Sequence, residues 1–374
     1  MQVIPIRDVQ QWDEVAQVWD CLAWGNPFRG RAWLRSWWNA YSHGQQLLIL
    51  QVNNNEGDII GFAPWYIERS LSQGQVVRFL GSGEVCSDYL GILATPEYVS
   101  QVAEALARWL TYQEGNGQGP VCDWDLLDLS GVDAVDPGMQ RLAEHLTNTG
   151  NHVHIRPGDR CWRIELPDSW DEYLKRLSKS HRKQVRRIER RYLENGLAKL
   201  YTARKRSELD EAMPMLVDLH QQRRVSLNEP GCFASASFTS FLREAVGQLS
   251  ESEAVELHWI ELEGRTVAAE LHLIGGIATY AYQAGVLPDA LDQEPGRIMN
   301  VAMLKHNIQE GQLVFDFLRG DEPYKAHWRA TPRPSLSYRV VPHRAAAQLR
   351  HQMWQAGDTM KHWVKAGLSL TGVL

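Results

Sequence analysis

Five residues that can bind anions or transfer protons fall within seven positions near the carboxyl end of the chain: Arg319, Asp321, Glu322, Tyr324 and Lys325. They follow Leu313 to Phe317 (LVFDF), an apolar run with the length of a short strand. A strand that ends in so many ionisable groups is typical of an active site, although a charged surface loop is the alternative. Asp316 alternates with its two phenylalanine neighbours and should face away from them, as a site carboxylate or a structural ion-pair partner.

A proline and a glycine precede the helix expected before that strand. Pro295 and Gly296 can open a helix whose first N–H groups are unpaired and carry a partial positive charge. Such a helix end suits an anion, so we expect the amides of Gly296 to Met299 to bind a diphosphate. Arg297 can add a charge-assisted contact. An ordinary turn before a helix is the alternative, and Gly311 lies where this helix should stop.

An acid and an imidazole share one face of another expected strand, Val267 to Ile274. Glu270 and His272 are two residues apart, so both point the same way from an otherwise apolar segment. This pair is a candidate general base. A solvated sheet face or a satisfied ion pair is the alternative.

The segment 175–191 carries the highest density of positive charge in the chain. It contains nine Lys and Arg and a single Glu, and the basic positions form a helical stripe beside an apolar one. Like charges at this spacing repel, and almost no acid offsets them. We expect this stripe to bind an anionic ligand, such as the 3′-phosphate of coenzyme A, an acidic polysaccharide, a nucleotide-linked sugar or a lipid headgroup. A solvated helix face is the alternative.

Composition describes an ordinary globular protein. The chain has 374 residues, 44% of them hydrophobic, a net charge of -6 and a pI of about 6.1, so no strong overall field favours nucleic acid or an anionic membrane. Five scattered cysteines without a CxxC pair argue for reduced thiols. His152 and His154 share a strand face without an evident third ligand, so no metal is expected. The first residues lack a signal-peptide pattern, and we expect a cytoplasmic protein with at most peripheral membrane contact.

Apolar periodicity predicts mixed α and β structure in both halves. Trp33 to Tyr41 has aromatic residues at helical spacing, and Tyr89 to Leu93 is expected to be a strand. Three successive strands are expected between Ala254 and Val286. The last residues, from Arg344 on, are expected to form a basic helix and a weakly apolar tail.

This pattern resembles the GNAT superfamily of acyl-CoA-dependent transferases. Gln293 to Ile298 (QEPGRI) is similar to the Gln/Arg-x-x-Gly-x-Gly/Ala turn of that superfamily, with Ile298 where a small residue is usual. The chain more specifically resembles the GNAT acetyltransferases named for cellulose biosynthesis. Segments that carry this resemblance are NPFRGRAWLRSWWNAY, GFAPWYIE, RFLGSGEVCSDYLGIL, LSKSHRKQVRRIERRYLENG and FDFLRGDEPYKAHW. Related tandem proteins of the FemAB type transfer aminoacyl groups.

The resemblance implies an α/β (α+β) fold with two tandem GNAT-like domains, each a mixed, mostly antiparallel sheet flanked by helices. Residues 1–166 would form a domain degenerate for donor binding, 167–342 the acyltransferase domain, and 343–374 a helical tail. It also implies that amides of the Val267 to Ile274 strand polarise the thioester carbonyl.

The same resemblance assigns candidate site residues. Those for the acyl-CoA donor are Gln293, Gly296, Arg297, Ile298, Met299 and Arg319. Those for catalysis are Glu270, Asp316, Tyr324 and Lys325. Tyr324 would protonate the leaving thiolate, and Lys325 would bind a phosphate or an anionic acceptor.

The preferred function is transfer of an acetyl or other acyl group from acyl-CoA to an amine or hydroxyl acceptor, a small molecule or a saccharide, in polysaccharide or exopolysaccharide biosynthesis. Two alternatives stay open. One is a FemAB-like transferase that uses aminoacyl-tRNA, in which the basic segment 175–191 would contact RNA. The other is a non-catalytic protein that binds anions or a membrane surface. Nucleic acid is not expected under the preferred function, because the basic stripe lacks interleaved exposed aromatic residues.

Overall fold

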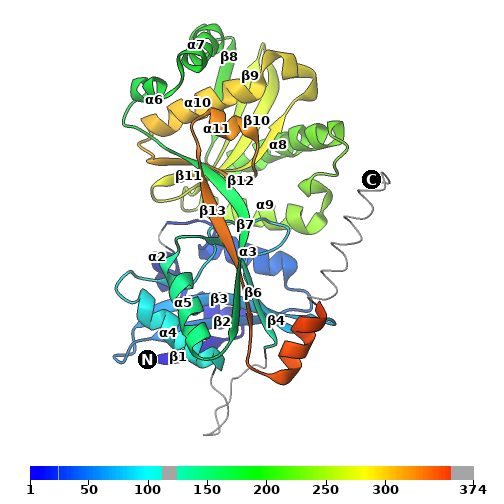
Figure 1. Ribbon diagram of the computed structural model, residues 1–374. Coiled ribbons are helices and arrows are strands. Elements are labelled where there is room, and N and C mark those ends of the chain that lie inside the picture. The colour runs from blue at the N-terminus through cyan, green and yellow to red at the C-terminus, as the bar shows by residue number, and fades with distance from the viewer. Residues whose placement is uncertain (24, 112–123, 355–374) are drawn as a thin grey trace, which may run out of the picture.

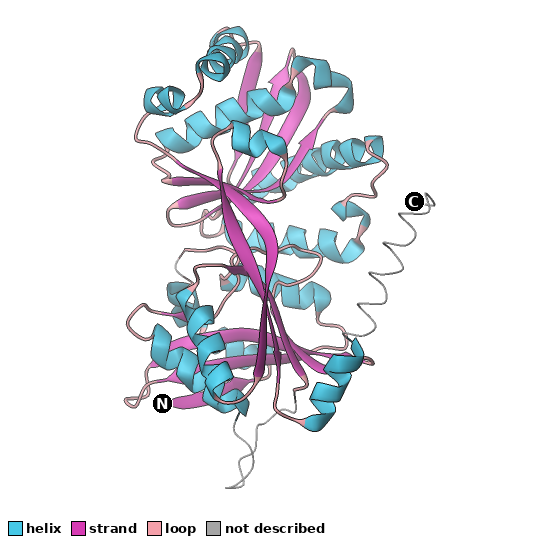
Figure 2. Ribbon diagram, viewed as in Figure 1, coloured by secondary structure: helices cyan, strands magenta, loops and turns pink. Residues whose placement is uncertain are grey.

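A single mixed sheet runs through the computed structural model, which describes residues 1–23, 25–111 and 124–354. The described strands form one 13-stranded sheet in the order β1-β2-β3-β4-β6-β13-β7-β12-β11-β10-β9-β8, with β5 paired to β3. Helices cover both faces of this sheet (Figure 2). The predicted α/β class with a mixed sheet flanked by helices is confirmed.

The amino-terminal half supplies one end of the sheet and the helices packed on it. Its strands are β1 (Gln2–Ile6), β2 (Gln46–Asn53), β3 (Ile59–Ser70), β4 (Gly74–Phe79), β5 (Leu93–Ala94), β6 (Leu126–Asp133) and β7 (His152–Glu165). Its helices are α1 (Val9–Glu14), α2 (Ala16–Leu22), α3 (Arg31–Tyr41), α4 (Val99–Thr111) and α5 (Pro137–Asn148).

The carboxyl-terminal half supplies the other end. Its strands are β8 (Ala198–Ala203), β9 (Val255–Leu262), β10 (Arg265–Ile274), β11 (Ala278–Val286), β12 (Val314–Arg319) and β13 (Thr331–Val341). Its helices are α6 (Trp170–Arg176), α7 (Lys179–Ile188), α8 (Arg206–Ser226), α9 (Ala236–Ser250), α10 (Pro295–Gln309) and α11 (Pro323–His327). A π-helix, η1 (Glu189–Glu194), extends α7, and the short helices η2 (Cys232–Ala234) and η3 (Pro288–Gln293) precede α9 and α10.

Strands β7 and β13 join the two halves. Although β13 comes last in the sequence, it lies between β6 and β7 and is antiparallel to both. Strand β7 then pairs with β12 through Arg163 to Glu165. These two strands cross the middle of the molecule in Figure 1. The sheet therefore continues across residue 166, and the division into domains at that residue stays a prediction.

Most predicted elements are confirmed, and one is wrong. The aromatic face of 33–41 forms α3, and the three strands predicted between Ala254 and Val286 are β9, β10 and β11. The strand predicted for Tyr89 to Leu93 is wrong, because only Leu93 and Ala94 form β5 and Tyr89 has a φ of 59°. A positive φ at a bulky residue breaks an extended strand. Residues 345–354 are helical, and the rest of the predicted tail lies outside the described residues.

An aromatic cluster packs the amino-terminal helix α3 against the other half. Trp33 is fully buried, and its ring meets those of Tyr282 and Phe241 edge-on at centroid distances of 4.9 and 4.7 Å. Its indole N–H donates to Ser87 Oγ at 2.8 Å. Trp33 therefore contacts β11, α9 and the loop before β5 at once.

We expect Trp33→Ala to lower the free energy of unfolding by about 3–5 kcal/mol, because a large cavity opens where the two halves meet. Leu71 is fully exposed, so Leu71→Ala should change that free energy by less than about 0.5 kcal/mol. Guanidinium-induced unfolding measures both variants. Equal effects of the two substitutions would contradict the packing described here.

Candidate functional site

Strands β11 and β12 separate soon after they begin. They pair in parallel only over Ala278↔Val314, Thr279↔Phe315 and Tyr280↔Asp316. Strand β11 continues to Val286, and along this part it pairs with β10 alone. Backbone groups on the β12 side of β11 therefore become free of ladder partners beyond Tyr280. Such an opening exposes N–H groups that can bind a ligand.

A β-bulge marks the same place. In the pairing of β10 with β11, His272 faces Ala281 whereas Leu271 faces Gln283, so Tyr282 is an additional residue. The Tyr282 hydroxyl donates to the carbonyl of Val85 at 2.8 Å, which anchors the bulge to the amino-terminal half.

Helix α10 begins beside the open edge of β11. Its N-cap, Glu294, has the left-handed conformation and forms an ion pair with Arg297. A Cβ built on Gly296 would have Val286 Cγ1, at 4.0 Å, as its nearest neighbour, so the space beside this glycine is open. The described hydrogen bonds give the Gly296 amide no acceptor. No side chain therefore packs directly against Gly296, where the anion-binding corner is predicted.

The remaining residues that were predicted to bind the donor differ in how far they are exposed. Gln293 is exposed at the end of η3, and Ile298 and Met299 are buried in the first turn of α10. The amides of Arg297 and Ile298 donate to the Glu294 carbonyl at 2.9 and 3.2 Å, so the expectation of a run of free amides is wrong for these two residues, and the Gly296 amide is the one left without an acceptor among them. The expectation that β10 supplies free amides is wrong, because β10 pairs with β9 on one edge and β11 on the other.

Two loops from opposite halves interlock beside this opening. The guanidinium of Arg319 donates to Asp88 Oδ1 at 3.0 and 2.7 Å and to the carbonyl of Ser87 at 3.0 Å. One residue further along, the Tyr89 hydroxyl donates to Asp316 Oδ2 at 2.5 Å. Arg319, predicted to contact the donor, thus ties β12 to the amino-terminal loop, and its role in donor binding stays a prediction.

Asp316 is the most strongly perturbed acid of the site. It is 1% exposed, and besides Tyr89 it accepts a hydrogen bond from the Leu318 amide at 2.7 Å. Burial raises the pKa of Asp316 to about 7, against the opposing effect of these two hydrogen bonds. A carboxyl group that titrates near neutral pH can accept or donate a proton during turnover.

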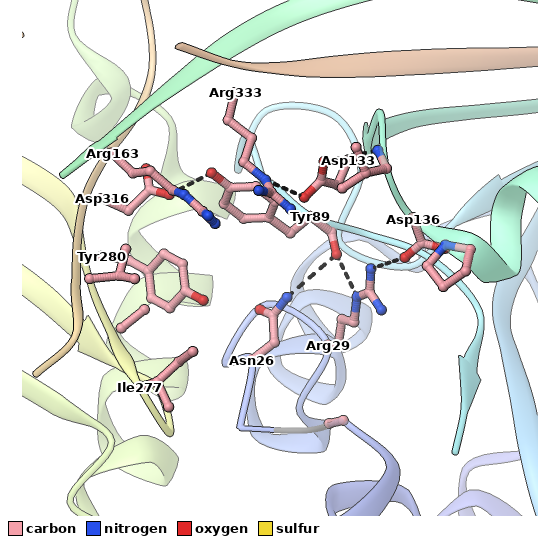
Figure 3. A pocket seen from close by; sticks show the side chains of 15 residues that line it. Asn26, Arg29, Tyr89, Asp133, Asp136, Arg163, Ile277, Tyr280, Asp316 and Arg333 are labelled. Carbon is pink, nitrogen blue, oxygen red and sulfur yellow. Dashed lines mark hydrogen bonds and ion pairs between the residues drawn. The ribbon is translucent and has the colours of Figure 1, made fainter. Parts of the chain in front are cut away.

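Asp316 lines a cavity of about 310 Å³ between the two halves. Figure 3 shows polar side chains from both halves around it, including Tyr280 of β11. Its three guanidinium groups belong to Arg29, Arg163 and Arg333.

Each of these arginines has an acidic partner. Arg29 pairs with Asp136 at 2.6 Å and also donates to the carbonyl of Tyr89 at 2.5 Å. Arg333 pairs with Asp133 at 2.6 Å. Arg163 pairs with Glu165 at 2.7 Å. The cavity walls therefore combine nearly balanced charges with two phenol rings, which suits a polar acceptor with several hydrogen-bonding groups.

The other predicted acid lies on the opposite face of the sheet. Glu270 is partly exposed and lies 2.9 Å from His272 Nε2, as their spacing predicted. The ring of Tyr324 is edge-on to Phe317 at 5.8 Å, and the residue is 45% exposed. Desolvation of the phenol, followed by the charge of Glu270, raises the pKa of Tyr324. Tyr324 therefore keeps its proton at neutral pH. The four predicted catalytic residues are divided between the two faces.

Lys325 is buried inside a turn. It is 2% exposed, and its Nζ donates to the carbonyls of Leu318, Arg319 and Gly320 at 3.2, 2.8 and 3.1 Å. Glu322 also lies 2.9 Å away. Through these contacts Lys325 stabilises the segment after β12. Its part in phosphate or acceptor binding stays a prediction.

The basic segment 175–191 forms the end of α6, all of α7 and the start of η1. Its lysines and arginines are exposed apart from the half-buried Arg182, and none has a carboxylate ion-pair partner in the described part of the chain. The rings of His181 in α7 and His327 in α11 lie 3.7 Å apart, so this basic surface adjoins the segment that follows β12.

Several residues of the site were not found from the sequence. Arg29 and Tyr89 do lie in segments that carry the family resemblance, NPFRGR and CSDYL. No sequence motif pointed to Tyr280, Arg163 or Arg333, because they come from separate strands that only the folded sheet brings together.

Comparison with known proteins finds a family similarity in the carboxyl-terminal half. Residues 179–326 match the family described as Acetyltransferase (GNAT) domain. The segment that matches this family contains β11, α10 and β12. The matched segment is less than half of the chain, and the resemblance to the cellulose-biosynthesis type has no counterpart in these comparisons. No curated protein matches the sequence.

Solved structures share the fold over most of the chain. FemX aligns with a TM-score of 0.63 at 13% identity and covers 90% of this chain and 97% of its own. A conserved protein of unknown function from Bacteroides thetaiotaomicron aligns with a TM-score of 0.54 at 9% identity, covering 91% and 100%. The carboxyl-terminal domain of a putative lysylphosphatidylglycerol synthetase from Agrobacterium fabrum aligns at 0.51 and 11% identity, covering 91% and 95%. At these identities the likeness concerns the fold.

We expect Lys325→Met to lower the free energy of unfolding by about 3–5 kcal/mol, because it leaves buried carbonyl groups and a nearby carboxylate without their cation. Lys199 is exposed, so Lys199→Met serves as the control. Chemical unfolding measures both. A Lys325→Met protein of unchanged stability but poor substrate binding would instead favour the anion-binding role.

Asp316 should make stability depend on pH. An unfolded aspartate has a pKa of about 3.9, whereas burial raises the pKa of Asp316 in the folded chain to about 7. Between these values the folded state holds one more proton than the unfolded state, so raising the pH lowers the free energy of unfolding. That loss should occur between about pH 4 and 7 and level off above.

Urea unfolding of wild type and Asp316→Asn across this range isolates the contribution of Asp316. We expect the stability of wild type relative to Asp316→Asn to fall as the pH rises. A constant difference between the two proteins would show that Asp316 titrates normally.

Proposed function

We propose that the protein transfers an acyl group from acyl-CoA to an amine or hydroxyl acceptor. The observation that carries this proposal is the opening between β11 and β12, with the amino end of α10 beside it, inside a segment that matches the GNAT domain. The Gly296 amide, which has no acceptor among the described hydrogen bonds, and the positive end of α10 would bind the diphosphate. Unpaired amides of β11 beyond Tyr280 would hold the pantetheine and polarise the thioester carbonyl.

The acceptor would bind in the cavity between the two halves. Because β11 and β12 part just beyond Tyr280 and Asp316, a group in this cavity can reach a thioester that enters from the α10 side. Asp316 would take the proton from the acceptor as its nitrogen or oxygen attacks the carbonyl carbon. The C–S bond then breaks, and coenzyme A leaves as its thiolate. Tyr324 would protonate that thiolate, since it keeps its own proton at neutral pH.

The two halves would have different tasks. Residues 167–342 would bind the donor, and residues 1–166 would contribute Arg29, Tyr89 and the neighbouring wall of the acceptor cavity. The charged and aromatic lining supports a compact polar acceptor, and a saccharide in polysaccharide or exopolysaccharide synthesis is the class we propose. No described helix is long and apolar enough to span a membrane.

The basic surface supports a second candidate, a FemAB-like transferase that uses aminoacyl-tRNA. Exposed lysines and arginines of 175–191 lack acidic partners in the described structure, and FemX shares the fold over most of the chain. Such a cationic surface binds RNA with an affinity that falls steeply with salt. Under the preferred function, the same surface would bind the 3′-phosphate of coenzyme A or an anionic acceptor.

Acetyl-CoA binding tests the donor site. Titration calorimetry should show one acetyl-CoA per chain. Gly296→Ala should retain binding, because a methyl group fits and alanine favours the helix. Gly296→Trp should weaken binding at least about tenfold, since the indole would fill the space intended for the diphosphate.

Thermal unfolding of both variants without ligand controls for misfolding. Equal affinities of the alanine and tryptophan variants would contradict the proposed donor site. Salt-sensitive RNA binding in the absence of any acetyl-CoA binding would favour the second candidate.

A further inference from the structure

Three side chains with metal-ligating atoms converge between β9 and α10, on the sheet face away from the acceptor cavity. Glu256 and His258 are two residues apart on β9 and therefore share a face. His306 reaches the same point from α10. One ligand atom from each residue lies within 4.8 Å of the others.

The two imidazoles each direct a nitrogen atom at the same carboxylate oxygen. His258 Nε2 lies 3.0 Å and His306 Nε2 lies 3.5 Å from Glu256 Oε2. Both Nε2 atoms are buried, yet neither makes a hydrogen bond of acceptable geometry with the described residues. The His258 side chain is 0% exposed. Buried polar atoms without a partner cost free energy, which a ligand at their common focus would recover.

Hydrogen bonds orient two of the three side chains, and an acid lies near the third. Thr202 Oγ1 lies 2.9 Å from His258 Nδ1, which leaves Nε2 with its lone pair when Nδ1 carries the proton. Arg204 donates to the other oxygen of Glu256 at 2.5 Å. Glu310 lies 4.0 Å from His306 Nδ1. Metal-binding histidines and carboxylates typically have such outer partners, which fix their direction.

We propose that Glu256 Oε2, His258 Nε2 and His306 Nε2 bind a divalent transition-metal ion, with Zn²⁺ the best match. Two imidazoles and one carboxylate form a set that zinc uses with tetrahedral geometry. Bonds of about 2.1 Å place tetrahedral ligand atoms about 3.4 Å apart, close to the 3.0 and 3.5 Å found for two of the three pairs. The sequence led us to expect no metal, and this ligand set revises that expectation.

The ion would fasten α10 to β9. Helix α10 runs from the proposed diphosphate site at Gly296 to His306 near its other end, so the metal would fix the helix on the sheet. Three protein ligands leave one tetrahedral position for water. His272, whose ring centroid lies 4.8 Å from that of His258, is outside the ligand set.

Metal binding by the full-length chain tests this proposal after treatment with a chelator. Calorimetry with Zn²⁺ should show one tight site, and addition of Co²⁺ should give the visible absorption of tetrahedral cobalt. Zinc should also raise the melting temperature. Glu256→Gln and His306→Gln should abolish the cobalt spectrum. Thr202→Val should weaken zinc binding by about 10- to 100-fold, because it removes an outer partner.

Two controls distinguish this site from adventitious binding. His272→Gln replaces a buried histidine beside the ligand set, and it should leave one zinc per chain. A double variant, His152→Ala with His154→Ala, removes histidines from β7 and should also bind normally. Melting of every variant without metal identifies those that fail to fold. The proposal is overturned if the chelator-treated wild type gives no cobalt spectrum, or if the spectrum survives in a folded Glu256→Gln or His306→Gln protein.

Discussion

The buried ion pair between Asp88 and Arg319 is the contact on which the site depends. The Asp88 side chain is 3% exposed, and a carboxylate at that depth is stable only with a cation beside it. This pair fixes the loop that carries Tyr89, whose phenol in turn orients Asp316. The Nζ of Lys325 donates to the backbone carbonyl of Arg319 and so holds the main chain of the same residue. One electrostatic requirement therefore links the amino-terminal loop, the end of β12 and the acid that we propose as the general base.

In the reaction that we propose, the sheet separates the donor from the acceptor. Alternation along β12 directs Asp316 to the cavity between the halves, while Phe315 and Phe317 face the side of α10. The opening between β11 and β12 lets the two sides meet at one point. A donor held at the amino end of α10 and an acceptor held by residues from both halves can then react across a sheet that stays continuous. Strand β13, the last strand of the described chain, completes the middle of the sheet and carries Arg333 to the cavity between the halves.

Local patterns predicted the elements better than they predicted the site. The spacing of aromatic residues was sufficient for α3, and Pro295 and Gly311 marked the limits of α10. Tyr89 was placed in a strand because its apolar neighbours have strand spacing, whereas the hydrogen bond to Asp316 accompanies a positive φ that no local pattern encodes. The same limit applies to Lys325, because three of its partners are backbone carbonyl groups, which leave no mark in the sequence. The histidines of β9 and α10 are 48 positions apart, so only the folded helix brings them together.

Hydrogen–deuterium exchange with and without saturating acetyl-CoA tests the central claim most directly, because it reports on backbone amides. If the donor lies along the open edge of β11 and at the start of α10, peptides that cover residues 281–286 and 296–299 should exchange more slowly when the ligand is present. Peptides from β1 and β2 should be unchanged. Slower exchange elsewhere in the chain, with no protection of these two segments, would contradict the account.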